Sequence, residues 1–174
     1  TVREMASRDE LRDIREGVGF EVLFGRVEQT INKAAARLTL LRWTLFQFLI
    51  GNSDAHGKNV SFFCSPDGLT LTPFYDLVSV VQYGELDQEL AMAYGDEFRA
   101  DQITPYDWAM FAEQTGTARS LLAREMRRMG TAAAAAVPLQ LADLHYETAE
   151  RKFLEGIAAH VIAQARKLID MAAP

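Results

Sequence analysis

Apolar positions recur at helical spacing over most of the chain. In the segment from Gly19 to Ile31 the large apolar side chains stand three or four residues apart, which predicts a first helix. A short polar break at Asn32-Lys33 separates it from a more apolar segment, about residues 35–50, which contains LTLLRWTLFQFLI. We expect a second helix here, packed against the first.

A different pattern follows. Two short β-rich runs, VSFF at 60–63 and LTLT at 69–72, flank a turn-forming Pro66-Asp67-Gly68. Pro, Asp and Gly each favour tight turns, so this segment predicts a small β-hairpin with Cys64 near its turn.

The remainder of the chain is helical in pattern. Thr104 and Pro105 form a typical helix start, and we expect this helix to run to about Thr115 before Gly116. A further helix over about 118–136 contains the alanine run 132–136 and should end at Pro138. The last helix is expected over about 146–171, with its apolar face formed by Phe153, Ile157, Val161, Ala165 and Leu168. The predicted fold class is mainly α with one small β-hairpin, in a single domain over residues 1–174.

Composition narrows the functional classes. The chain has 49% hydrophobic residues, enough for a sizeable core, and a net charge of −6 without a long basic run, so any association with nucleic acid should be indirect. A single cysteine, Cys64, excludes an intrachain disulfide, and with no apolar run of membrane-spanning length we expect a cytoplasmic protein without membrane contact. The first fifteen residues are charged, with weak helical signal, and we expect them to be loosely held.

Polar and ionisable side chains are most concentrated in GNSDAHGKN, residues 51–59, directly after the most apolar predicted helix. Because Gly, Asn, Ser and Asp are ordinary turn formers, this segment is compatible with a simple connection. Asp54 and Asn59, however, have the five-residue separation of the kinase catalytic loop, H-R-D-x-x-x-x-N, in which Asp faces the substrate hydroxyl and Asn reaches magnesium. Such a site needs a second acidic ligand, and Asp76 in TPFYDL follows the hairpin, where the chain returns to the loop.

Three segments in this order resemble one family, the HipA-like toxin serine/threonine kinases of bacterial toxin–antitoxin systems. FLIGNSDAHGKN is similar to the family's catalytic loop, LTPFYDL to its magnesium-binding segment, and ELAMAYGDEFRADQIT with YDWAMFA to the stretch that follows. The resemblance extends over about residues 19–116. Two departures from protein kinases in general are that D-F-G is absent at Asp76 and that Asn52-Ser53 replace His-Arg.

The resemblance implies a role for each matching residue. Asp54 would be the catalytic base, and Asn59 and Asp76 would bind Mg²⁺. His56 lies two residues after the base, where it would either help neutralise the transferring phosphate or hydrogen-bond within the loop. Lys58 would either contact a phosphate of ATP or be solvated.

Other candidate sites have weaker support. A zinc site at Asp54, His56 and Cys64 is unlike structural zinc centres, which usually have four Cys or His ligands. His145 and His160 lie on the last predicted helix and are expected at the surface or in packing. The segment GVGFEV at residues 17–22 lacks the third glycine of a phosphate-binding loop, and helical periodicity begins at once, so we expect a helix start.

The resemblance also implies what lies outside these residues. A protein kinase needs a β-rich lobe with a nucleotide-covering loop and a lysine on a strand, whereas only 53 residues precede Asp54 and they are helical in pattern. We therefore expect this chain to be the C-terminal lobe of a larger kinase that uses ATP and Mg²⁺, and to be inactive alone. Family members phosphorylate an aminoacyl-tRNA synthetase and are restrained by a HipB-like, DNA-binding antitoxin. A non-catalytic interaction module or degenerate kinase lobe, and a small-molecule phosphotransferase, remain as alternatives.

Overall fold

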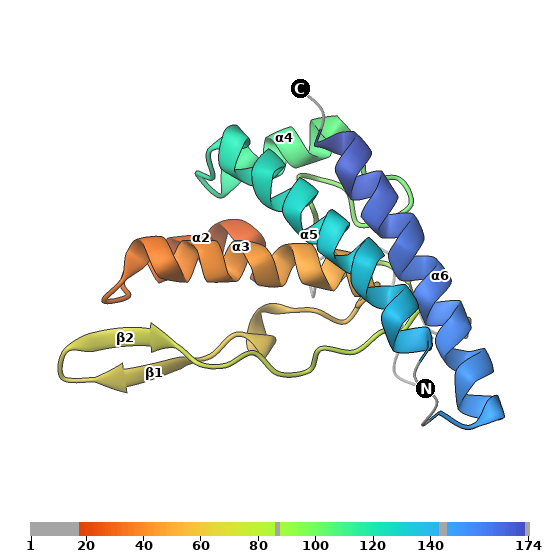
Figure 1. The fold of residues 1–174 in the computed structure, drawn as a ribbon. Helices are drawn as coiled ribbons and strands as arrows, with labels where there is room; N and C mark the ends of the chain where they lie inside the picture. The colour runs from red at the N-terminus through yellow and green to blue at the C-terminus, as the bar shows by residue number, and fades with distance from the viewer. Residues whose placement is uncertain (1–17, 86–87, 143–145, 173–174) are drawn as a thin grey trace, which may run out of the picture.

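A computed structural model describes residues 18–85, 88–142 and 146–172. Among them are a two-stranded antiparallel sheet, a short 3₁₀ turn (Gly57–Asn59) and the helices shown in Figure 1. The mainly α class with one hairpin is confirmed. The charged segment expected to be loosely held lies outside the described residues. The helices and strands are α2 (Phe20–Val27), α3 (Lys33–Ile50), β1 (Phe62–Ser65), β2 (Gly68–Leu71), α4 (Pro105–Gln114), α5 (Arg119–Leu141) and α6 (Thr148–Met171).

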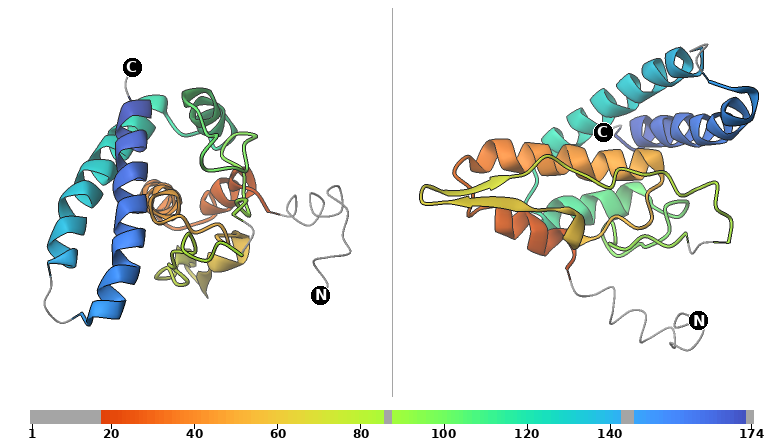
Figure 2. Two further views of the ribbon diagram at one scale, coloured as in Figure 1. Left: turned by 90° about the vertical axis from the view of Figure 1, so that its right-hand side faces the viewer. Right: turned by 90° about the horizontal axis from the view of Figure 1, so that it is seen from below.

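Helix α3 occupies the centre of the fold. Helices α5 and α6 run side by side across one face of it, and the hairpin extends along another (Figures 1 and 2). Its buried side chains lie on several faces of the helix, as is typical of a helix surrounded by other elements. In the part of the chain that the structure describes, no helix is both long and apolar enough to cross a membrane.

An aromatic cluster joins α3 to α2 and α4. The ring of Tyr94 lies 4.9 Å from Trp108 and 5.0 Å from Phe20, and Phe48 of α3 contacts both Tyr94 and Trp108. The Tyr94 hydroxyl donates a hydrogen bond of 2.8 Å to the carbonyl of Thr44, which satisfies its polar end. Burial raises the pKa of Tyr94 above its ordinary value, so the hydroxyl stays a donor at neutral pH.

Helices α5 and α6 approach closely because a glycine lies between them. A Cβ atom added at Gly130 would come within 2.8 Å of Ile169 Cγ1 and 2.9 Å of the Ala165 carbonyl oxygen. On α6, Ala165 and Leu168 are buried as expected, but Phe153 is 46% exposed and lies on the outer end of the helix beside Tyr83.

The prediction that Pro138 ends α5 is wrong. The helix continues to Leu141, and the carbonyl of Pro138 accepts a hydrogen bond from the Ala142 N–H. Proline has a helical φ, and its cost in a helix is the loss of its own N–H bond together with crowding of its ring against the carbonyl one turn back. Three residues from the helix end, that loss does not prevent the last turn from forming.

The element boundaries around the hairpin also differ from the predicted ones. The strands lie at residues 62–65 and 68–71 and are joined by Pro66-Asp67 alone, so Cys64 belongs to β1 and is exposed. Helix α2 ends at Val27 instead of Ile31, because residues 30 and 31 leave the helix to pair with β2 at Leu69. This pairing ties the hairpin to the start of α3.

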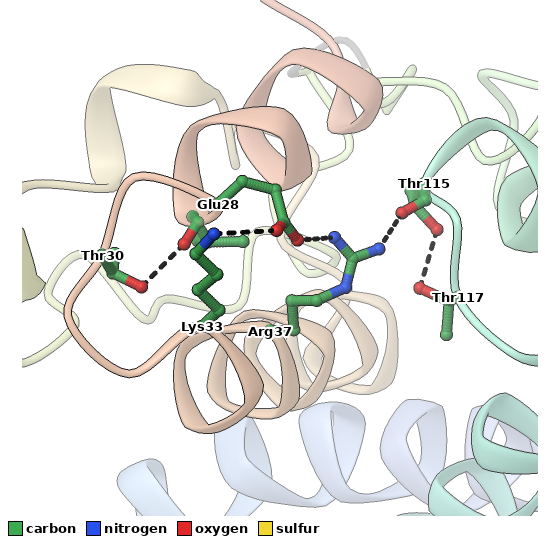
Figure 3. A network of polar contacts seen from close by, with 7 residues as sticks. Glu28, Thr30, Lys33, Arg37, Thr115 and Thr117 are labelled. Atoms are coloured by element: carbon green, nitrogen blue, oxygen red, sulfur yellow. Dashed lines mark hydrogen bonds and ion pairs between the residues drawn. The ribbon is translucent and has the colours of Figure 1, made fainter.

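A polar network joins the ends of three helices (Figure 3). The Arg37 guanidinium on α3 pairs with Glu28 at 2.7 Å and donates to the carbonyl of Thr115, which follows α4. It also lies over the ring of Phe24, 5.5 Å from the centroid. Arg37 therefore connects α2, α3 and the end of α4.

Glu125 of α5 is a buried carboxylate with arginine partners. Its side chain is 2% exposed and accepts hydrogen bonds from Arg42 of α3 at 2.9 Å and from Arg128 at 2.8 Å. Burial alone would raise the pKa of Glu125, but the bonds from these arginines outweigh it and the pKa is lowered. This contact explains why the apolar α3 contains Arg42.

The first prediction concerns this contact. Glu125→Gln should reduce the free energy of unfolding by about 1.5–3 kcal/mol, because hydrogen bonds to a charged group are lost in a buried site. Since the folded-state pKa is lowered, the wild-type advantage should be complete above the ordinary pKa of 4.5 and shrink as the pH falls below it. Urea unfolding at pH 7 and pH 3 measures both effects.

The control is Glu113→Gln, the same substitution at an exposed position of α4. It should change stability by less than about 0.5 kcal/mol. Equal stability losses for the two variants at pH 7 would show that the Glu125 contact does not hold α3 to α5.

Candidate active site

The loop that follows α3 begins at a glycine that no other residue can replace without strain. Gly51 has a φ of 67°, and its N–H bonds back to α3 carbonyls as a helix C-cap. A Cβ atom there would lie 2.3 Å from Val81 Cγ1 and 2.6 Å from His160 Nε2 of α6. The start of the loop is therefore enclosed by the segment after the hairpin and by α6.

Asn52, the next residue, is buried and connects three parts of the chain. Its Nδ2 donates to Gln47 Oε1 in α3 and to the backbone carbonyl of Asp76, both at 3.0 Å. Its Oδ1 accepts the N–H of Asp54 at 3.2 Å.

Asn59 and Asp76, the two predicted metal ligands, lie in direct contact. Asn59 Nδ2 donates to Asp76 Oδ2 at 2.7 Å, although seventeen residues separate them. The Asn59 side chain is buried, and its Oδ1 accepts the N–H of His56 at 2.9 Å, which closes the loop around it. Asp76 is exposed and has a φ of 58°, a left-handed conformation that Asp and Asn tolerate better than most residues.

Asp54, the predicted base, has an exposed side chain on the same loop. The residues beside it are fixed: the carbonyl of Ser53 accepts the Ala91 N–H at 2.8 Å, and Asn52 accepts the Asp54 N–H. A solvent-facing carboxylate on a fixed backbone is suited to take a proton from a bound hydroxyl group.

His56 and Lys58 are placed differently. His56 is partly buried, and its N–H serves the loop through Asn59. The Lys58 side chain is exposed, while its carbonyl accepts a hydrogen bond of 2.6 Å from the Tyr75 hydroxyl. The Tyr75 hydroxyl also contacts the Ser61 hydroxyl at 2.9 Å. Because Tyr75 directly precedes Asp76, these contacts connect the Asp76 segment to the loop.

The donor set at Asn59 and Asp76 fits Mg²⁺, a hard cation that takes carboxylate, amide, water and phosphate oxygens. The hydrogen bond from Asn59 engages one of the two carboxylate oxygens of Asp76, and Asn59 Oδ1 retains a second lone pair beyond its bond to His56. Within the described residues, no three side chains of His, Cys, Asp or Glu gather to hold a metal ion.

Two contributors to this site were not predicted. Asn52 was noted only as a departure from the kinase pattern, because its partners Gln47 and Asp76 meet only in the folded chain. His160 was assigned to the surface or to packing, and it packs, half-buried, against Gly51. Burial lowers the pKa of His160, which favours the neutral ring beside the loop. His145 lies outside the described residues, and GVGFEV enters helix α2 at Phe20, as expected.

A comparison with protein families identifies the family to which this chain belongs. The family described as the HipA-like C-terminal domain matches residues 3–137, more than three quarters of the chain. The chain belongs to this family. The match extends beyond the predicted range of resemblance in both directions.

Curated relatives include a HipA protein. The serine/threonine-protein kinase toxin HipA of Shewanella oneidensis is 45% identical over 127 residues, which are 73% of this chain and 29% of that protein. The Y4mE protein of Sinorhizobium fredii is 34% identical over 106 residues, 61% of this chain and 25% of its own length. The matched residues thus span less than a third of the length of each of these relatives.

A solved structure has the same fold. A chain in the complex of Shewanella oneidensis HipA, HipB and operator DNA matches with a TM-score of 0.84 at 39% identity. The match covers 93% of the HipA-like chain and 38% of the solved one. It extends well past residue 137, so most of α6 belongs to the shared fold.

Proposed function

We propose that this chain, over residues 1–174, is the C-terminal catalytic lobe of a HipA-like serine/threonine protein kinase of a toxin–antitoxin system. In the full-length protein it transfers the γ-phosphoryl group of ATP to a protein hydroxyl. The observation that supports the proposal is the 2.7 Å hydrogen bond between Asn59, the last residue of a D-x-x-x-x-N loop, and the downstream Asp76, the pairing that a kinase site needs.

Each residue has a chemical role in this proposal. Asp54 accepts the proton of the substrate hydroxyl as its oxygen forms a bond to the γ-phosphorus, and the bond to the β,γ-bridging oxygen breaks to release ADP. Asn59 and Asp76 are the residues that would hold Mg²⁺, and the ion would supply positive charge to neutralise the phosphates. Lys58 is exposed and extends toward solvent, where it can contact a phosphate, and His56 supports the loop.

The family suggests the partners. The solved relative is described as a complex with HipB and operator DNA, which supports a HipB-like antitoxin for this protein and an indirect association with DNA. The net charge of −6 is consistent with this, because a DNA-binding face is typically basic. We propose an aminoacyl-tRNA synthetase as the protein substrate and the cytoplasm as the location, both by family resemblance.

The second prediction tests this function. The protein encoded by the complete reading frame should transfer radiolabelled phosphate from ATP to serine or threonine of a protein. The purified 174-residue chain should unfold cooperatively yet show no ATP turnover above a no-enzyme control, because a kinase also needs a nucleotide-covering loop and a phosphate-pairing lysine. Absence of transfer by the full-length protein, or clear turnover by the chain alone, would contradict the proposal.

A further inference from the structure

We propose that Asn52 is a positioning residue that holds Asp54 and Asp76 in one fixed arrangement. Its contribution to catalysis rests on the proposed kinase function, whereas its structural contribution does not. The three hydrogen bonds of its side chain carry the inference.

The Asn52 side chain uses both kinds of polar group at once. Its amide has two N–H donors, and the structure provides two acceptors for them, Gln47 Oε1 and the Asp76 carbonyl. Its oxygen accepts the N–H of Asp54. The Asn52 side chain is 3% exposed, so little water can replace a lost hydrogen-bond partner. We therefore expect a substitution that removes one of these bonds to leave its partner unsatisfied.

The bond to Asp76 acts on a strained part of the backbone. Among the described residues other than glycine, Asp76 alone has a positive φ. Such conformations persist only where the surroundings fix them, and they are frequent at active sites. By binding the Asp76 carbonyl, Asn52 fixes the peptide group that follows, while Asn59 binds the carboxylate.

The bond to Gln47 gives this arrangement a rigid base. Gln47 is 2% exposed and lies in the last turn of α3, the central helix. Asn52 thereby connects a buried helix to both functional segments, one before the hairpin and one after it. Residues that orient metal ligands in this way typically contribute 10- to 100-fold to metal affinity or activity.

The substitution Asn52→Asp separates the bond that Asn52 accepts from the two bonds that it donates. Aspartate has nearly the same shape and can still accept the Asp54 N–H, but it cannot donate to the Asp76 carbonyl or to Gln47. Asn52→Ser is a second variant, which removes both amide N–H donors, leaves only a shorter hydroxyl and buries no charge. The control is Thr44→Val, which removes a buried hydroxyl in α3 that donates to the carbonyl of Leu40, away from the loop.

Hydrogen exchange in the full-length protein tests the structural contribution. In both Asn52 variants, the Val80 amide of segment 74–80, which donates to the Gly51 carbonyl, should exchange at least about tenfold faster than in the wild type, because losing a buried partner makes local opening of this segment easier. In Asn52→Asp the Asp54 amide should be affected less than this segment, because its acceptor is retained. Unchanged exchange in 74–80 in both variants, or an equal increase in Thr44→Val, would overturn the inference.

The magnesium dependence of phosphoryl transfer tests the catalytic contribution. The half-saturating Mg²⁺ concentration should rise roughly 10- to 100-fold in the Asn52 variants, with partial recovery of the rate at high Mg²⁺, and should not change in Thr44→Val. A merely structural defect lowers the active fraction without shifting this concentration. An unshifted half-saturating Mg²⁺ concentration in the Asn52 variants would overturn the inference. Absence of transfer by the wild type would instead contradict the kinase proposal, and hydrogen exchange would then be the test of Asn52.

Discussion

Replacing Asp54 by asparagine in the full-length protein should slow phosphoryl transfer by roughly 10²- to 10⁴-fold, the usual effect of removing a positioned acid–base group. Nucleotide affinity in the presence of Mg²⁺ should stay nearly unchanged. The Asp54 carboxylate is exposed and is assigned to the substrate hydroxyl, not to the metal. Its backbone N–H, which Asn52 accepts, is retained in the variant, so the loop should keep its conformation.

Single-turnover phosphorylation and calorimetric nucleotide titration measure the two quantities separately. Asp170→Asn makes the same chemical change at an exposed position near the end of α6 and should leave both quantities unaltered. If Asp54→Asn transferred phosphate at the wild-type rate, Asp54 would not be the base, and GNSDAHGKN would be a simple connection.

Replacing Asp76 by asparagine should impair both binding and chemistry. Losing a charged ligand should lower the affinity for the magnesium–nucleotide complex by at least about tenfold and slow transfer as well. Asparagine adopts left-handed backbone conformations as readily as aspartate, so the variant should keep its φ of 58°. The neutral side chain can also still accept the bond from Asn59. The weaker binding and slower transfer of Asp76→Asn would therefore result from the lost carboxylate charge, not from a changed loop conformation.

The same titration and the same single-turnover assay decide the assignment of Asp76, again beside Asp170→Asn. The expected signature is weaker nucleotide binding that depends on Mg²⁺, in contrast to Asp54→Asn. Indistinguishable nucleotide affinities for the two variants would contradict the division between base and metal ligand.

Local signals along the chain were sufficient for much of the fold. Thr104 and Pro105 start α4 as predicted, because capping and a fixed proline φ act within a few residues. The spacing of Asp54, Asn59 and Asp76 indicated one site because each residue type has a distinct role in phosphoryl transfer. The contact between Asn59 and Asp76 required only that the hairpin return the chain to the loop.

Other features depend on partners distant in sequence. Arg42 interrupts the apolar pattern of α3 in the sequence, and its partner, Glu125 of α5, is apparent only in the folded chain. Pro138 ends a helix by local rules, yet one lost hydrogen bond near the end of α5 is not enough to stop it. Asn52 resembles a turn residue in the sequence, and its function in the loop depends on a carbonyl twenty-four residues away.

The close approach of His160 to Gly51 bears on where this domain ends. The family match stops at residue 137, but the side chain that encloses the start of the loop belongs to α6, which begins at Thr148. A truncation at the border of sequence similarity would leave the D-x-x-x-x-N residues in place and remove the helix behind them. Sequence change in α6 can therefore alter the surroundings of the loop without touching any of its residues.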